Sequence, residues 1–139
     1  MPTDTSSASE VVQRLVDATN RHDLAALVDC FAQDFVNETP THPARSFTGV
    51  EQVRKNWSLI FAAVPDLEAD VVHKMIEADT AWTEWEMRGT RTDGSRHLFR
   101  GVTIFGVRQG RFEWVRFYLE PVDEGAAGVD QSLRQQLGR

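Results

Sequence analysis

The chain has 139 residues, 41% of them hydrophobic and 26% charged, which is typical of one globular domain and excludes a wholly disordered chain. Its net charge of −6 disfavours binding to nucleic acid, and no apolar run reaches the roughly 18–20 residues that span a bilayer. A single cysteine, Cys30, excludes an intramolecular disulfide. We therefore expect a cytoplasmic protein with no nucleic-acid partner and no membrane contact.

Two amphipathic helices are predicted at the start of the chain. Ser7 to Glu10 has the spacing of a capping box, and apolar residues recur at helical spacing from there to Asn20. Asp23 can cap a second helix, whose apolar stripe ends at Phe31. The short connection between them predicts a helical hairpin, with Cys30 as a small core residue.

A brief strand and a third helix follow. Phe35 to Thr39 is partly β-branched and is closed by Pro40, which opens a loop over residues 40–46. Thr48 to Glu51 predicts a second capping box, and an apolar stripe continues from there to Pro65.

The rest of the chain alternates with period two, which indicates strands. They are expected at 67–77, 80–91, 97–108 and 111–120, and the last three are joined by tight turns that predict antiparallel hairpins. Helices followed by a meander predict an α+β fold. We expect a flexible N-terminus over 1–8, the folded domain over 9–121, and a tail over 122–139 with a short helix at 130–137.

The two faces of the predicted strands differ in what they can contact. In the strand at 80–91, Ala81, Thr83, Trp85 and Met87 share one apolar face, and Trp82 lies with charged residues on the other. The last two strands carry apolar residues on both faces. Three helices can cover one face, so we expect a second copy on the other, giving a homodimer through the outer face of the sheet.

This order of elements resembles the nuclear transport factor 2-like superfamily, in particular its SnoaL-like and ketosteroid isomerase-like branch. The resemblance covers Glu10 to Pro121 and is most specific in the run VVQRLVDATNRHDLAALVDCFAQDFV at Val11 to Val36. The terminal run GRFEWVRFYLEP at Gly110 to Pro121 is also similar. The resemblance implies a curved, antiparallel or mixed sheet wrapped as a cone around three N-terminal helices, with a pocket between them. Because this fold hosts many chemistries, function must be argued from the site.

The resemblance also implies where acid/base groups would lie. Isomerases of this kind place a carboxylate base just before the proline that ends the first strand, where this chain has Thr39, or Glu38 if the alignment shifts by one residue. Their two oxyanion donors correspond here to Leu15 and Thr103, so both strong donors are missing and the sequence disfavours steroid-type isomerisation. The carboxylate that epoxide hydrolases of this superfamily carry directly after an arginine is replaced by Phe117.

SnoaL-type cyclases carry an acidic general acid/base near the end of the last strand, and Glu120 matches it. The candidate catalytic residues are therefore Glu38, Glu120 and Thr39. The candidate residues for binding a substrate are Asn37, His42, Trp57, Phe61, His73, Trp85, Met87, Phe99, Thr103, Phe105 and Phe117. His97, at a strand start, is expected to face solvent or to be structural.

Two functions remain open from the sequence. The first is a protein that binds a hydrophobic small molecule, with cofactor-free acid/base chemistry of the cyclase, isomerase or lyase type, or an epoxide-hydrolase-like reaction. The second is a non-catalytic module of the same fold that binds a ligand or dimerises. The four histidines are scattered without paired spacing, so we expect no metal site and no cofactor.

Overall fold

The computed structural model describes residues 5–138, and three helices precede a meander of four strands, as the α+β prediction requires. Its helices are α1 (Ala8–Asn20), α2 (Leu24–Asp29), α3 (Val50–Ala63) and α4 (Val129–Gln136), with a single turn of 3-10 helix, η1 (Pro43–Arg45). Its strands are β1 (Phe31–Glu38), β2 (Phe47–Thr48), β3 (Glu68–Glu77), β4 (Thr80–Thr90), β5 (Arg96–Arg108) and β6 (Arg111–Pro121). Part of the expected flexible N-terminus, residues 1–4, lies outside the described residues.

The N-terminal helical hairpin begins with the predicted caps. The Ser7 hydroxyl accepts a hydrogen bond from the Glu10 amide at 3.2 Å, and the Glu10 carboxylate accepts one from the Ser7 amide at 3.0 Å. Asp23 caps α2 by accepting from the Ala26 amide at 3.0 Å. Both helix starts are therefore confirmed.

The second predicted capping box is wrong. The N-cap of α3 is Gly49, which has a φ of 96° and no side chain that could cap, and Thr48 lies in β2 opposite Val36 of β1. Thr48, which the sequence pattern assigned to the helix cap, is instead paired with a neighbouring strand. The helix itself runs as predicted and ends before Pro65.

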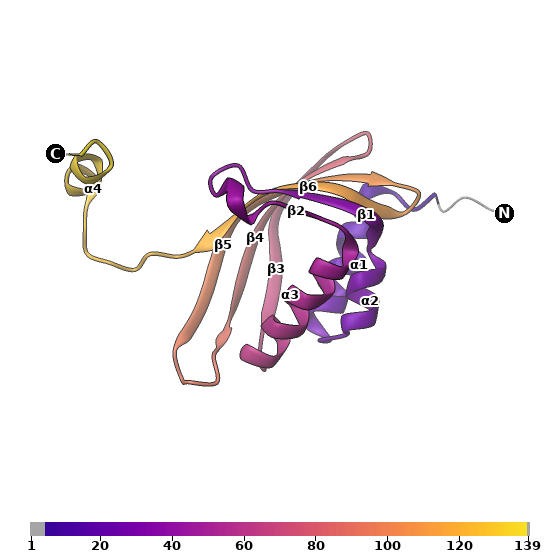
Figure 1. The fold of residues 1–139 in the computed structure, drawn as a ribbon, viewed down its shortest axis with the longest axis horizontal. Helices are drawn as coiled ribbons and strands as arrows, with labels where there is room; N and C mark the ends of the chain where they lie inside the picture. Colours follow the sequence, from indigo (N-terminus) through magenta and orange to yellow (C-terminus); the bar gives the residue numbers. More distant parts are fainter. Residues whose placement is uncertain (1–4, 139) are drawn as a thin grey trace.

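The six strands form one mixed sheet in the order β2-β1-β6-β5-β4-β3. β3 to β6 make the predicted antiparallel meander, and β1 pairs in parallel with β6. That pairing begins at Phe31, opposite Phe112, so β1 is longer than the predicted strand. Figure 1 shows the sheet curving around α1, α2 and α3, all of which lie on one side of it.

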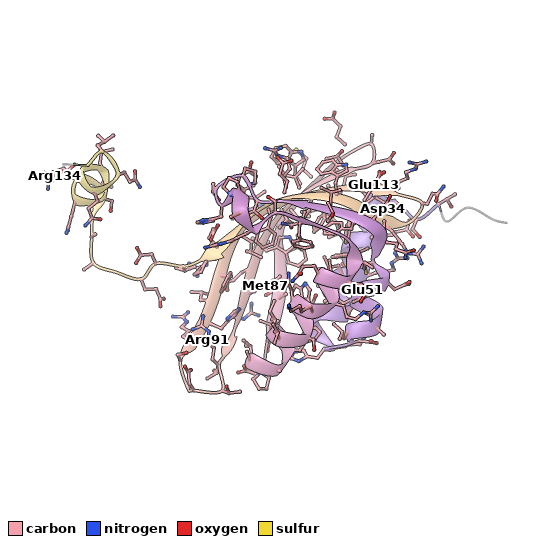
Figure 2. The ribbon with its side chains drawn as sticks, viewed as in Figure 1. Asp34, Glu51, Met87, Arg91, Glu113 and Arg134 are labelled. Atoms are coloured by element: carbon pink, nitrogen blue, oxygen red, sulfur yellow. The ribbon has the colours of Figure 1, made fainter. Side chains whose placement is uncertain are left out.

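The core fills the space between the helices and the concave face of the sheet. The face of β4 that was predicted to be apolar is buried there, with Trp85 only 2% exposed, and Figure 2 shows Met87 between the sheet and the helices. Only Val53 is buried in α3, although Trp57 and Phe61 of the same helix pack against the core. The sheet-facing side of α3 therefore borders a space that side chains do not fill completely.

Among residues 5–138, no other element covers the convex face of the sheet or the C-terminal segment. Trp82 of β4 is 52% exposed on the convex face. α4 has no buried residue and stands apart from the rest of the chain in Figure 1, and Figure 2 shows Arg134 on this separate helix. No helix among residues 5–138 is long and apolar enough to cross a membrane.

We predict that Cys30 is unreactive in the folded protein. It is buried, and burial raises the pKa of its thiol from the ordinary value of 9.0 to about 11, so about one thiol in a thousand is ionised at pH 8. An aromatic disulfide reagent should label it only after denaturation. Rapid, complete labelling of the native protein would contradict the assigned core.

The same shift predicts a pH dependence of stability. Between about pH 9 and about pH 11, the Cys30 thiol is ionised in the unfolded protein but keeps its proton in the folded protein. Because the folded state then binds more protons, the free energy of unfolding should fall as the pH rises through this window. Urea unfolding of the wild type and of Cys30→Ala at several pH values measures the contribution of this one group.

Candidate functional site

A cavity of about 320 Å³ lies between the concave face of the sheet and the helices. Its wall is mostly apolar, with side chains from α1, α3 and five strands. The apolar lining residues are Leu15, Phe31, Phe35, Phe47, Val53, Trp57, Ile60, Trp85, Met87, Phe99, Phe105, Val115, Phe117 and Leu119. The polar ones are Thr19, Asn37, Thr39, Arg45, Asn56, His97, Thr103 and Glu120.

The buried wall of the cavity contains a hydrogen-bond network that is closed on itself. The Thr83 hydroxyl donates to the Thr103 carbonyl at 2.7 Å, so the 2.8 Å bond between the two hydroxyls is donated by Thr103. Trp85 Nε1 donates to both hydroxyl oxygens at 2.8 Å. Every proton of these three groups is used inside the network, which leaves none to donate to a molecule in the cavity.

The rim of the cavity, in contrast, carries ionisable groups. Glu120 lies near the C-terminal end of β6, and its carboxylate is 3.1 Å from Nε2 of His42 and 3.8 Å from the Arg45 guanidinium. η1 and the residue before it bring these two basic side chains to the strand end. The Glu120 side chain is 34% exposed, so this cluster joins the cavity to solvent.

The side-chain directions at the end of β1 determine which of two candidate catalytic residues, Glu38 or Thr39, faces the cavity. Asn37 and Thr39 line it, and the Asn37 amide donates to the Thr39 hydroxyl at 2.9 Å. Glu38 lies between them on the other face of the sheet, where its carboxylate is 2.6 Å from the Arg116 guanidinium. Because successive strand side chains point to opposite faces, the expectation of Glu38 as a pocket base does not fit its position.

The ion pair of Glu38 is well supported by its neighbours. A hydrogen bond to Tyr118 and the charge of Glu38 raise the pKa of Arg116, so the guanidinium stays positive. With Glu38 engaged on the convex face, Glu120 is the carboxylate that borders the cavity.

Most residues that the sequence singled out for ligand binding lie in this wall, and three do not. Those in the wall are Asn37, Trp57, Trp85, Met87, Phe99, Thr103, Phe105 and Phe117. His73 is exposed on β3, because a register shift between Val71 and His73 interrupts the alternation there. Phe61 stacks against His22 with a centroid distance of 4.8 Å, outside the cavity lining. His42 reaches the site only through its contact with Glu120.

His97 is a lining residue that the sequence analysis placed elsewhere. Its ring stacks on Phe99 with centroids 4.5 Å apart and forms part of the cavity wall. Burial, and then the nearby positive charge of Arg91, lower the pKa of the imidazole below its usual value. The alternation of strand side chains could have predicted this position, since residue 97 shares a strand face with Phe99 and Thr103.

Within residues 5–138, no group of three or more His, Cys, Asp or Glu side chains is arranged to hold a metal ion. What the site offers is an apolar cavity with a carboxylate and a histidine in contact at its rim.

A family model for the SnoaL-like domain matches residues 12–115. The chain belongs to the SnoaL-like domain family. No curated protein matches it.

Solved structures show the same fold at low sequence identity. A putative SnoaL-like polyketide cyclase from Jannaschia sp. CCS1 is 21% identical, with a TM-score of 0.69 over 86% of this chain and 89% of that one. AclR, a putative hydroxylase from Streptomyces galilaeus, is 17% identical, with a TM-score of 0.71 over 94% and 91%. An LEH-like epoxide hydrolase from M. tuberculosis is 18% identical, with a TM-score of 0.69 over 81% and 82%. These neighbours establish the fold of this SnoaL-like protein, and its chemistry must come from its own residues.

We predict that Thr103→Val destabilises the protein by about 0.5–1.5 kcal/mol, because it removes the hydrogen bonds that the Thr103 hydroxyl makes with Thr83 and Trp85, while these two residues stay bonded to each other. Thr48→Val, on an exposed residue of β2, is the matched control and should change the free energy of unfolding by less than about 0.5 kcal/mol. Chemical denaturation measures both. Equal, small effects would show that the network does not stabilise the cavity wall.

Proposed function

We propose that this SnoaL-like protein binds a hydrophobic small molecule in its cavity and catalyses cofactor-free proton transfer on it. The single observation that carries the proposal is an apolar cavity bordered by one carboxylate, Glu120, in contact with His42. A molecule with an apolar body would fill the wall, and its reacting carbon would lie at the rim near Glu120.

The size of the cavity supports small-molecule binding. About 320 Å³ lies within the range of roughly 300–1,000 Å³ that ligand pockets occupy, at its lower end. Trp57 and Trp85 line the space and do not fill it. A compact mono- or bicyclic compound fits this volume better than a large polycyclic one.

The proposed proton transfer uses groups at the rim. The Glu120 carboxylate takes a proton from the carbon next to a ligand carbonyl, and the electrons of that C–H bond move to the carbonyl oxygen as an enolate forms. Return of a proton from Glu120 to the same or another carbon completes an exchange or an isomerisation. His42 holds the carboxylate in place at 3.1 Å, and Thr39 offers a hydroxyl on the β1 side of the cavity.

A second candidate is ligand binding without catalysis. The closed network of Thr83, Thr103 and Trp85 favours it, because these three groups have no proton left to donate to a developing oxyanion. The two candidates share the binding step and differ in whether Glu120 moves a proton.

We expect the protein to accelerate exchange of the α-protons of 2-tetralone in deuterium oxide, measured by proton NMR. Glu120→Gln should lower the rate at least about tenfold, since a general base commonly contributes 10²–10⁴-fold. Glu113→Gln is the control, because Glu113 lies on the same strand but pairs with Arg108 away from the cavity.

Binding is separated from catalysis by a variant that narrows the cavity. Asn56→Trp places an indole at the lining position on α3, and Lys55→Trp places one at an exposed position next to it. The first should weaken 2-tetralone binding, seen as loss of ligand line broadening, and the second should not. Binding with no Glu120-dependent exchange would leave the non-catalytic candidate; no binding would overturn both.

We also propose that a second copy of the chain covers the convex face of the sheet. A shallow apolar groove lies on this face, lined by Thr80, Trp82, Gly101, Val102, Ile104, Trp114, Arg116 and Tyr118. Trp114 packs directly over Gly106, where any side chain would collide with the indole. The floor of the groove therefore requires glycine at position 106. Exposed aromatic surface of this kind is typical of subunit interfaces.

Trp82→Glu should shift the protein from dimer to monomer in sedimentation velocity at micromolar concentration, because it buries a charge in the proposed interface. Leu59→Glu is the matched control, since Leu59 is 63% exposed on α3, on the opposite side of the sheet. A monomeric wild type, or a Trp82→Glu variant that stays dimeric, would exclude this interface.

A further inference from the structure

We propose that His97 recognises the bound molecule by donating a hydrogen bond from Nε2 to an uncharged carbonyl oxygen. This inference rests on the proposed function, because it requires a molecule in the cavity, and it narrows the ligand to an apolar compound with a ketone or comparable carbonyl group.

Several polar side chains in the wall already have partners within the protein. The Thr19 hydroxyl donates to the Leu15 carbonyl at 2.7 Å, and the Asn37 amide donates to Thr39. The Thr103 hydroxyl is used in the network with Thr83 and Trp85. A ligand carbonyl oxygen buried beside Thr19 or Thr103 would therefore lack a donor, at a cost comparable to any unsatisfied buried polar group.

His97 differs from these residues in having a nitrogen without a partner. Among residues 5–138, its Nδ1 is the only buried side-chain nitrogen or oxygen that lacks a hydrogen bond. A buried N–H without an acceptor is rarer in proteins than an unused acceptor, so the proton belongs on Nε2. Nε2 is then the nitrogen through which the ring can meet a molecule in the cavity, and it meets it as a donor.

The position of the ring suits this role. His97 lies at the start of β5, opposite Gly89 of β4, and its stacking on Phe99 holds the imidazole plane in the cavity wall. Gly89 has no side chain and packs closely against Val64, so the ring is not crowded by a neighbour on β4. The imidazole is thus a fixed polar group in an otherwise aromatic part of the wall.

The charge state of the ring selects the kind of oxygen that it can recognise. Burial, and then the charge of Arg91, lower the pKa of His97, so the imidazole is neutral near pH 7. A neutral imidazole offers one N–H to a carbonyl oxygen without the charge that would favour a carboxylate.

The test uses 6-propionyl-2-(dimethylamino)naphthalene, whose fluorescence shifts to longer wavelength when its carbonyl accepts a hydrogen bond. The matched probe is 6-propyl-2-(dimethylamino)naphthalene, which lacks the carbonyl oxygen. Wild-type protein should bind the ketone about tenfold more tightly than His97→Phe does, and the bound emission should move to shorter wavelength in the variant. His97→Gln, which keeps an N–H donor, should recover part of both effects.

Two controls keep the outcome specific. The propyl probe should bind wild type and His97→Phe within about twofold of each other, which shows that the cavity is intact. His73→Phe, at an exposed position on β3, should leave the binding and emission of the ketone unchanged.

The failures are distinguishable. If both probes bind but the ketone binds wild type and His97→Phe equally, with the same emission, the carbonyl finds its donor elsewhere and the inference on His97 is overturned. If neither probe binds the wild-type protein, the cavity does not take apolar molecules and the proposed function fails together with the inference.

Discussion

The parallel pairing of β1 with β6 is the constraint on which the site depends. It joins a strand from the N-terminal half to the last strand of the meander and so completes the curved sheet that encloses the helices. Its register also sets Asn37 opposite Val115 and Glu38 opposite Arg116. One consequence is that Asn37 and Thr39 point into the cavity; the other is that the loop after β1 brings His42 against Glu120 at the end of β6.

The polar groups of the cavity are distributed unevenly, and this distribution orients any ligand. The buried wall holds a network that satisfies itself, while the rim holds a carboxylate, a histidine and an arginine that also reach solvent. An apolar molecule would gain most by placing its apolar end against the buried wall and its polar end towards the rim. Reaction chemistry and ligand recognition are therefore expected at the same end of the cavity, around Glu120 and His97.

The two faces of the sheet form different surfaces: one borders the cavity and the other is the exposed convex face. In β4, β5 and β6, residues of one parity form most of the cavity wall, and residues of the other parity form most of the convex face with its exposed Trp82 and shallow groove. Glu120 is an exception at the end of β6, because it borders the cavity although it shares its parity with Arg116 and Tyr118 of the groove. A substitution on one face can therefore alter association without altering the cavity, which is why matched variants on the two faces separate the two properties.

The sequence by itself determined the helix caps at Ser7 and Asp23, the meander and most of the aromatic wall, because these follow from local patterns. The SnoaL-like resemblance came instead from the order of the elements and from the runs at 11–36 and 110–121. It could not choose between Glu38 and Thr39, since that choice depends on the register of β1 against a strand about 80 residues away. Nor could it join His42 to Glu120. Those placements were decided by the tertiary structure alone, because strand pairing and sheet curvature set which distant side chains share one enclosed volume.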